Sequence, residues 1–172
     1  MKRNTKIVIG VVGVLAVAVV VLALLNWGNV ASKKEAQEDG VFSLYAGDGE
    51  YTVSMSDVEA LASSDIKADY KKSGQDPETK SFLGASFKAL VESLGIDVSA
   101  FSSVSFTAAD GYASALDIDE AMDGENCFIV IAMEGEPLGD SEDGGSGPFM
   151  MIMAKDQFNQ RWCKFLLEVR LQ

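Results

Sequence analysis

Few residues of this chain could perform catalysis, because its 172 residues include no histidine and only two cysteines. The lack of histidine excludes imidazole-based proton transfer and every metal site that needs a histidine ligand. Ser64-Asp65-Ile66-Lys67 has the Ser-x-x-Lys spacing that supplies the nucleophile of serine acyl enzymes. The segment falls in a predicted strand rather than at the start of a helix, and no partner motif follows. We therefore interpret this match as coincidental.

Carboxylates beside a glycine-rich segment form a second candidate site. Asp140, Glu142 and Asp143 precede Gly144-Gly145-Ser146-Gly147 and could offer oxygen ligands to calcium. Their spacing does not match the helix–loop–helix calcium motif, and the glycines lack the lysine and the spacing of a phosphate-binding loop. The segment predicts a flexible loop, and an acidic cation-binding or adhesion module is kept as an alternative function.

Sulfur side chains could bind a soft metal or form a disulfide. Met150, Met151 and Met153 lie close together, but methionines in an apolar strand more often fill a core. Cys127 and Cys163 also lie in apolar segments, where buried thiols behave as small hydrophobic side chains. A disulfide between them is the alternative and requires Cα atoms ~4.4–6.8 Å apart. We predict no catalytic residue and no metal ligand among these residues.

The N-terminal segment predicts a membrane anchor. Residues 7–25 contain only Ile, Val, Leu, Ala and Gly, and a helix of this length spans ~28 Å, close to the thickness of a bilayer core. Three basic residues precede this run, which favours a cytoplasmic N-terminus, and Trp27 follows it. A signal peptide cleaved near Val30-Ala31-Ser32 is the alternative. We expect a single-pass protein of the cell membrane whose C-terminal domain is extracytoplasmic.

The chain beyond the anchor is strongly acidic. Residues 33–172 include 26 acidic and 11 basic residues, which gives a net charge of −15. This balance excludes nucleic acid as a partner, because its phosphates must be met by Lys and Arg. Attraction of cations or of a basic partner is the alternative to a simple solvated surface. We divide the chain into a cytoplasmic basic tip at 1–6, a transmembrane anchor at 7–27, a tether at 28–40 and a domain at 41–172.

Short strands with few helices between them predict one α+β domain with mixed, largely antiparallel sheets. Ser56 and Glu59 match a capping box at the start of a short helix. Apolar residues recur at helical spacing from Phe87 to Leu94, and Gly95 is expected to end that helix. Strands are predicted at 41–45, 65–72, 79–83, 104–108, 112–116, 127–133, 149–153 and 162–171, with one helical turn at 117–122.

The order of small motifs from about Tyr51 to Leu171 resembles the molybdopterin-binding domain of the sulfite oxidase family of oxidoreductases. The segments that carry the resemblance are, in chain order, Phe82-Leu83-Gly84, the helix from Phe87 to Gly95, Asp110-Gly111-Tyr112, Ala132 to Leu138, Gly147-Pro148 and Arg161-Trp162-Cys163-Lys164. The resemblance implies a sulfite-oxidase-type fold, here in a short membrane-anchored, single-domain version with one N-terminal transmembrane helix.

The resemblance also implies a molybdopterin cofactor, with Arg161, Lys164, Asp110, Gly111 and Tyr112 as the cofactor-binding residues. In the family, a cysteine thiolate from a segment before the position of Gly84 completes the ligands of the molybdenum, and a histidine helps to hold the pterin phosphate. Residues 41–83 of this chain contain no cysteine, and the chain has no histidine. A neutral side chain cannot replace a thiolate in tuning the metal.

Our leading hypothesis is therefore a non-catalytic or repurposed domain that binds a ligand or a protein partner on the outer face of the membrane. It predicts that replacing Arg161 and Lys164 leaves folding intact. The alternative is an oxidoreductase subunit that still binds molybdopterin with altered metal ligation.

Overall fold

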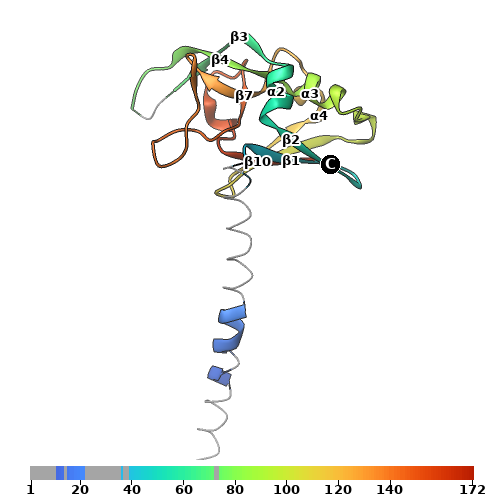
Figure 1. Cartoon of the computed structure of the whole chain (residues 1–172), viewed down its shortest axis with the longest axis vertical. Helices are drawn as coiled ribbons and strands as arrows, with labels where there is room; N and C mark the ends of the chain where they lie inside the picture. Colours follow the sequence, from blue (N-terminus) through green and yellow to red (C-terminus); the bar gives the residue numbers. More distant parts are fainter. Residues whose placement is uncertain (1–10, 14, 22–35, 37–38, 72–73) are drawn as a thin grey trace, which may run out of the picture. The chain divides into compact units, whose positions relative to one another are not determined.

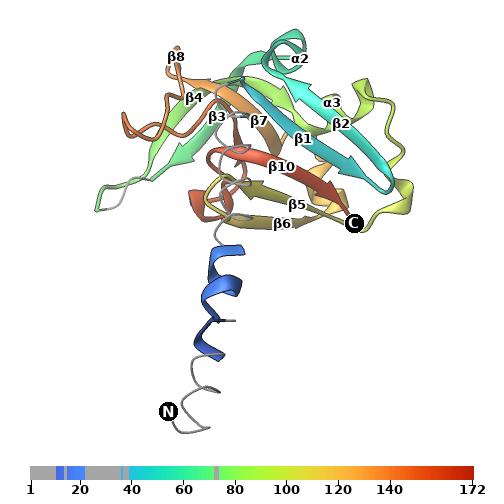
Figure 2. The same cartoon turned by 60° about the horizontal axis from the view of Figure 1, so that its bottom comes forward.

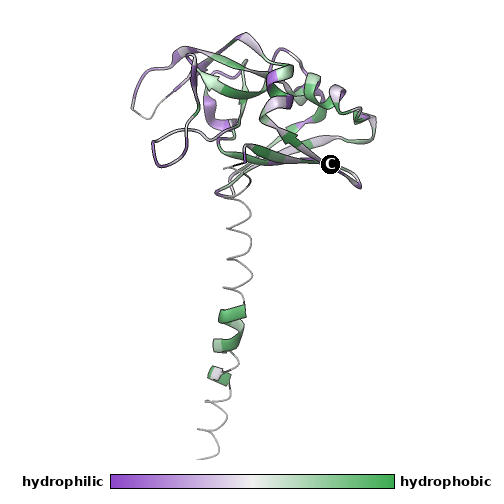
Figure 3. Cartoon of the chain, in the orientation of Figure 1, coloured by the Kyte–Doolittle hydropathy of each residue, from purple (hydrophilic) through white to green (hydrophobic). Residues whose placement is uncertain are grey.

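The computed structural model describes residues 11–13, 15–21, 36, 39–71 and 74–172, and it divides the chain into two units, Met1–Glu35 and Ala36–Gln172. In the first unit, residues 11–13 and 15–21 are helical and strongly apolar (Figures 1 and 3). No helix among the described residues is long and apolar enough to cross a membrane. The predicted tip at 1–6, about half of the predicted span at 7–27 and most of the tether at 28–40 lie outside the described residues.

The second unit contains two five-stranded sheets (Figure 2). The first sheet has the order β2-β1-β10-β5-β6. Its strands are β1 (Val41–Ala46), β2 (Gly49–Ser54), β5 (Ser103–Ala108), β6 (Ala113–Asp117) and β10 (Leu166–Leu171). β1 and β10 pair in parallel, and the other neighbours are antiparallel. The first and last strands of the domain therefore lie side by side.

The second sheet has the order β3-β4-β7-β8, and β9 also pairs with β7. Its strands are β3 (Ser63–Tyr70), β4 (Glu78–Ser86), β7 (Cys127–Met133), β8 (Glu136–Pro137) and β9 (Met150–Met153). All of these pairs are antiparallel. β7 lies at the centre and has the bounds predicted from its apolar run, which confirms the expectation of a buried central strand.

The first helix of the domain, α2 (Met55–Ala60), begins one residue before the predicted N-cap. Its N-cap is Ser54, whose hydroxyl accepts the Asp57 N–H while the Asp57 carboxylate accepts the Ser54 N–H at 2.8 Å. The predicted capping box of Ser56 and Glu59 is wrong, because the aspartate three residues after Ser54 completes the reciprocal pair instead. The Ser54 hydroxyl, which donates to the Asp57 carboxylate at 2.6 Å, and then the Ser54 N–H lower the pKa of the Asp57 carboxyl.

Helix α3 (Phe87–Ser93) confirms the predicted amphipathic helix. Ser86 caps its N-terminus, and Gly95 follows it with a positive φ of 69°, as expected for a glycine that ends a helix. Short helical segments complete the domain: α4 (Ile118–Ala121), η1 (Val98–Ala100) and η2 (Asn159–Arg161).

The observed strands differ from the predicted ones in several places. No strand is predicted at β2 or at β8, because Val53 is the one fully buried side chain of β2 and β8 has only two residues. The strand predicted at 162–171 begins only at Leu166, because Phe165 has a left-handed backbone with φ of 52° that a regular strand cannot contain. Before that residue, Cys163 pairs with Met151 through an isolated bridge.

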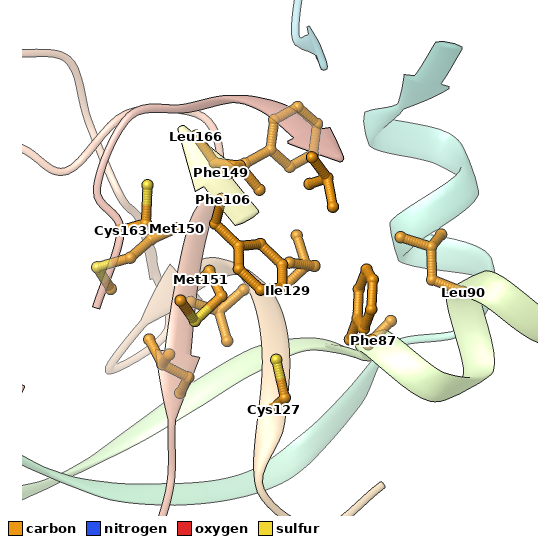
Figure 4. Close-up of a cluster of buried hydrophobic side chains, with 14 of the residues drawn as sticks. Phe87, Leu90, Phe106, Cys127, Ile129, Phe149, Met150, Met151, Cys163 and Leu166 are labelled. Carbon is orange, nitrogen blue, oxygen red and sulfur yellow. The ribbon is translucent and has the colours of Figure 1, made fainter. Parts of the chain in front are cut away.

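One hydrophobic core joins both sheets and the helices (Figure 4). Phe87 of α3 meets Phe106 of β5 edge to face, with ring centroids 5.2 Å apart. All four residues of β9 are fully buried, so the methionines at 150, 151 and 153 are core side chains as predicted. The predicted α+β class with largely antiparallel sheets is therefore confirmed.

Candidate functional site

A pocket of about 250 Å³ brings together three of the five predicted site residues. Its lining comprises Ala108, Asp110, Tyr112, Gln160, Trp162 and Lys164. These residues come from the turn between β5 and β6 and from the segment that leads into β10. Gly111 lies in the same turn, whereas Arg161 does not line the pocket.

The turn at Asp110 and Gly111 places Tyr112 at the pocket. The Tyr112 N–H donates to the Asp110 carboxylate at 2.9 Å, and Gly111 takes a φ of 90° that favours glycine. The Tyr112 hydroxyl donates to the Gln160 carbonyl at 2.8 Å, which joins the turn to the opposite wall. Burial raises the pKa of the Tyr112 phenol, with a smaller contribution from Cys163. Two hydrogen bonds of Tyr112, one within the turn and one to the segment before β10, therefore fix the position of the turn.

A left-handed residue positions Lys164. Phe165, which follows it, donates its N–H to the Ser146 carbonyl at 2.7 Å and accepts the Ala109 N–H at 3.0 Å. Gly147 packs so closely on Phe165 that a Cβ at Gly147 would overlap its Cα at 2.7 Å. Backbone conformations of this kind persist where the surrounding structure fixes them, and they cluster at functional sites.

Trp162 lines the pocket, and two further aromatic side chains pack against it. Tyr70, the last residue of β3, stacks on Trp162 with ring centroids 5.8 Å apart, and Phe82 meets Trp162 edge to face at 5.6 Å. The Lys164 ammonium donates to the Tyr70 hydroxyl at 3.0 Å and lies 5.3 Å from the Tyr70 ring centroid. Within the described residues no carboxylate pairs with Lys164. No sequence pattern indicates Tyr70 as a site residue, because it lies 94 positions away from Lys164.

Arg161, which is predicted to bind the cofactor, is paired with acidic side chains in the structure. Its guanidinium binds two carboxylates: Nε donates to Asp156 at 2.8 Å, and Nη1 and Nη2 donate to Glu120 at 2.9 and 2.8 Å. These bonds, first to Asp156 and then to Glu120, raise the pKa of the guanidinium. Arg161 thereby ties α4 to the segment before η2, and its charge is already balanced by two carboxylates.

This geometry changes the expected effect of replacing Arg161. We expect Arg161→Met to lower the free energy of unfolding by ~1 kcal/mol, since it breaks the ion pairs with Glu120 and Asp156. The effect is limited because these side chains are partly exposed. Lys164→Met should change stability less, because its ammonium bonds only a neutral phenol. Urea unfolding of both variants measures the difference. If Arg161→Met were as stable as the parent chain, the result would support the expectation from the sequence that Arg161 binds a ligand and does not stabilise the fold.

Both thiols are buried in the core and unpaired, so the alternative of a disulfide is wrong. Burial raises the pKa of both thiols, to about 12 for Cys163, where the charge of Asp110 adds to the effect. Such thiols are poor nucleophiles and poor metal ligands, because the reactive form is the thiolate. Neither cysteine lines the pocket of Lys164.

A larger pocket of about 640 Å³ lies at the other end of β3. It is lined by residues of β3, β4 and β7 and of the segment after α4, and Lys67 is among them while Ser64 is not. The Ser-x-x-Lys segment lies in β3, as predicted, which supports its interpretation as coincidental. In the part of the chain that the structure describes, no three Cys, Asp or Glu side chains gather where they could hold a metal ion.

Comparisons with known proteins agree with this fold. Residues 47–172 match the family described as the oxidoreductase molybdopterin binding domain. Among solved structures, the sulfane dehydrogenase SoxCD from Paracoccus pantotrophus is similar, with a TM-score of 0.58 and 12% sequence identity. The match covers 78% of this chain but only 38% of that chain, so it concerns the fold. No curated protein matches. The chain belongs to the oxidoreductase molybdopterin-binding domain family.

Proposed function

We propose that this chain is a membrane-anchored, extracytoplasmic domain that has kept the molybdopterin-binding fold but performs no oxidoreduction. In this role it binds a ligand or a protein partner on the outer face of the membrane through the pocket of Lys164. The observation that carries the proposal is the position of the two thiols, both of which lie in the core with raised pKa values rather than at the pocket.

The described residues do not fit a molybdenum cofactor. The metal of the resembling enzymes needs a thiolate ligand, and neither Cys127 nor Cys163 can present one at the pocket. A pterin phosphate needs several cations, whereas Lys164 is the one described basic residue that lines the pocket and Asp110 lines it too. Arg161, the second cation expected there, is neutralised by Glu120 and Asp156. We therefore assign no redox step to this chain.

The features that remain at the pocket favour binding of a non-metal partner. Tyr112 is 42% exposed, and the Lys164 ammonium has no carboxylate partner among the described residues. An exposed aromatic ring beside a cation suits a partner with an apolar or planar group next to an anionic one. The membrane location rests on the sequence, in which an apolar run at 7–25 follows three basic residues.

The metal and pterin content of the purified chain tests this proposal. We expect full-length protein from a host that makes the cofactor to contain far less than one molybdenum or pterin per chain, measured by elemental analysis and by fluorescence after oxidation. Lys164→Met, purified in parallel, serves as the matched control for any pterin held at the pocket. Stoichiometric molybdenum with pterin would overturn the proposal and support a molybdopterin-dependent subunit with altered metal ligation. Pterin without metal, lost in Lys164→Met, would identify pterin itself as the ligand.

A further inference from the structure

Strand β3 forms one edge of the second sheet. Its neighbour on one side is β4, and in the described residues no strand lies on the other side (Figure 2). The outer backbone groups of such a strand can pair with a strand of another chain. A bulge between Ser63 and Ile66, where Asp65 N–H turns to the Ser63 hydroxyl, interrupts the regular pairing. The regular part of the edge is therefore Ile66 to Tyr70.

The position of Ser81 in β4 shows which backbone groups of β3 point outward. Its N–H donates to the Glu134 carboxylate at 2.7 Å, and its carbonyl accepts the Glu134 N–H at 2.8 Å, so both groups face away from β3. Ser81 lies opposite Lys67. Because backbone pairing alternates along antiparallel strands, the N–H and carbonyl of Lys67 point away from β4, and those of Asp69 do the same.

The side chains on the exposed face of this edge alternate in sign. Asp65, Lys67, Asp69 and Lys71 are exposed, while the three residues between them are buried. Lys67 has no ion pair within the described residues. The edge is locally neutral although residues 33–172 carry a net charge of −15. Charged side chains on an edge strand usually discourage pairing with other strands. Here the charges alternate in sign, which favours a partner strand whose charges alternate in the opposite order.

We propose that β3 pairs antiparallel with β3 of a second copy of this chain, about a two-fold axis at Ala68. This register places Lys67 opposite Asp69 of the partner subunit and Asp65 opposite Lys71 of the partner subunit. The two-fold axis repeats both pairs, so two Lys67–Asp69 pairs lie within the regular edge and two Asp65–Lys71 pairs flank it at the bulge. The outward backbone groups of Lys67 and Asp69 then bond to those of the partner strand.

The alternating charges and the position of the bulge favour this register over registers in which the two-fold axis lies at another residue of β3. An axis at Lys67 or Asp69 places like charges opposite one another. An axis at Ile66 or Tyr70 forms only two opposite-charge pairs, and these use a residue outside the regular edge. Ala68 is also the midpoint of the regular edge from Ile66 to Tyr70. Register, charge and edge geometry therefore agree on one symmetric arrangement, which extends the second sheet across two molecules.

Charge exchange between Lys67 and Asp69 tests the interface. Sedimentation equilibrium of the full-length chain in density-matched detergent should give a dimer. Lys67→Asp and Asp69→Lys, each alone, should raise the dissociation constant at least ~10-fold, because like charges then face each other. The double variant Lys67→Asp/Asp69→Lys restores opposite charges and should dimerise again.

Lys88→Asp is the matched control, because it makes the same charge change on α3, where Lys88 is also exposed. It should dimerise like the parent chain, and thermal unfolding of every variant should confirm an intact fold. A monomeric parent chain would overturn the proposal. So would a dimer that Lys67→Asp leaves unchanged, which would place the association elsewhere in the chain, such as its apolar N-terminal segment.

Discussion

Replacing Gly84 with alanine is expected to lower the free energy of unfolding by at least ~3 kcal/mol. Gly84 lies in β4 opposite Val130 of β7, where the register between these strands shifts. A Cβ at this position would overlap the carbonyl oxygen of Ile129 and the Cα of Val130. Both are backbone atoms of the central strand, which no change of side-chain rotamer can move aside. The strands must separate, and the core contacts of Ile129 would be disturbed with them.

Gly124→Ala is the matched control for this prediction. Gly124 lines the same large pocket as Gly84, but its nearest neighbours to an added Cβ are Lys88 Cδ at 3.7 Å and Ser86 Oγ at 4.0 Å. We expect Gly124→Ala to stay within ~0.5 kcal/mol of the parent chain in urea unfolding. A similar small effect for Gly84→Ala would show that β4 and β7 can move apart at little cost, and would contradict the close approach of the two backbones.

Much of the fold follows from local sequence patterns. The apolar run at 127–133 predicts β7, because a strand buried on both faces is continuously apolar. The spacing from Phe87 to Leu94 predicts α3, because a helix buried on one face has apolar residues three and four positions apart. β2 escapes prediction since it buries one side chain fully and relies on backbone pairing with β1. The start of β10 also escapes prediction, because the left-handed backbone of Phe165 is fixed by its contacts with Ser146 and Ala109 rather than by its own side chain.

The candidate site was only partly visible in the sequence. The motif resemblance picked out Asp110, Tyr112 and Lys164, and the fold brings them to one pocket. It also picked out Arg161, whose partner Glu120 lies 41 positions earlier. Sequence spacing cannot show that the charge of Arg161 is already balanced by carboxylates, one of which comes from a different element of the fold.

Cys163 is expected to make the domain less stable as the pH rises above 9. Its pKa rises from an ordinary value of 9.0 to about 12 in the folded chain, first because of burial and second because of the charge of Asp110. Below pH 9 the thiol keeps its proton in both states and its contribution to stability is complete. Between pH 9 and 12 the unfolded chain loses this proton while the folded chain retains it, so the unfolded state is favoured increasingly.

The size of this loss can be measured by comparison with chains that lack the thiol. A tenfold difference in proton affinity corresponds to ~1.4 kcal/mol, so between pH 8 and 10.5 the parent chain should lose ~2 kcal/mol more than Cys163→Ala. Cys163→Ser is the control for the change in packing. The two variants can differ in absolute stability but should share the same shallower dependence on pH, because neither side chain titrates in this range. Urea unfolding under reducing conditions supplies the values. An identical pH dependence in the parent chain and both variants would mean that solvent reaches Cys163 in the folded domain, and that this thiol could serve as a ligand at the neighbouring pocket.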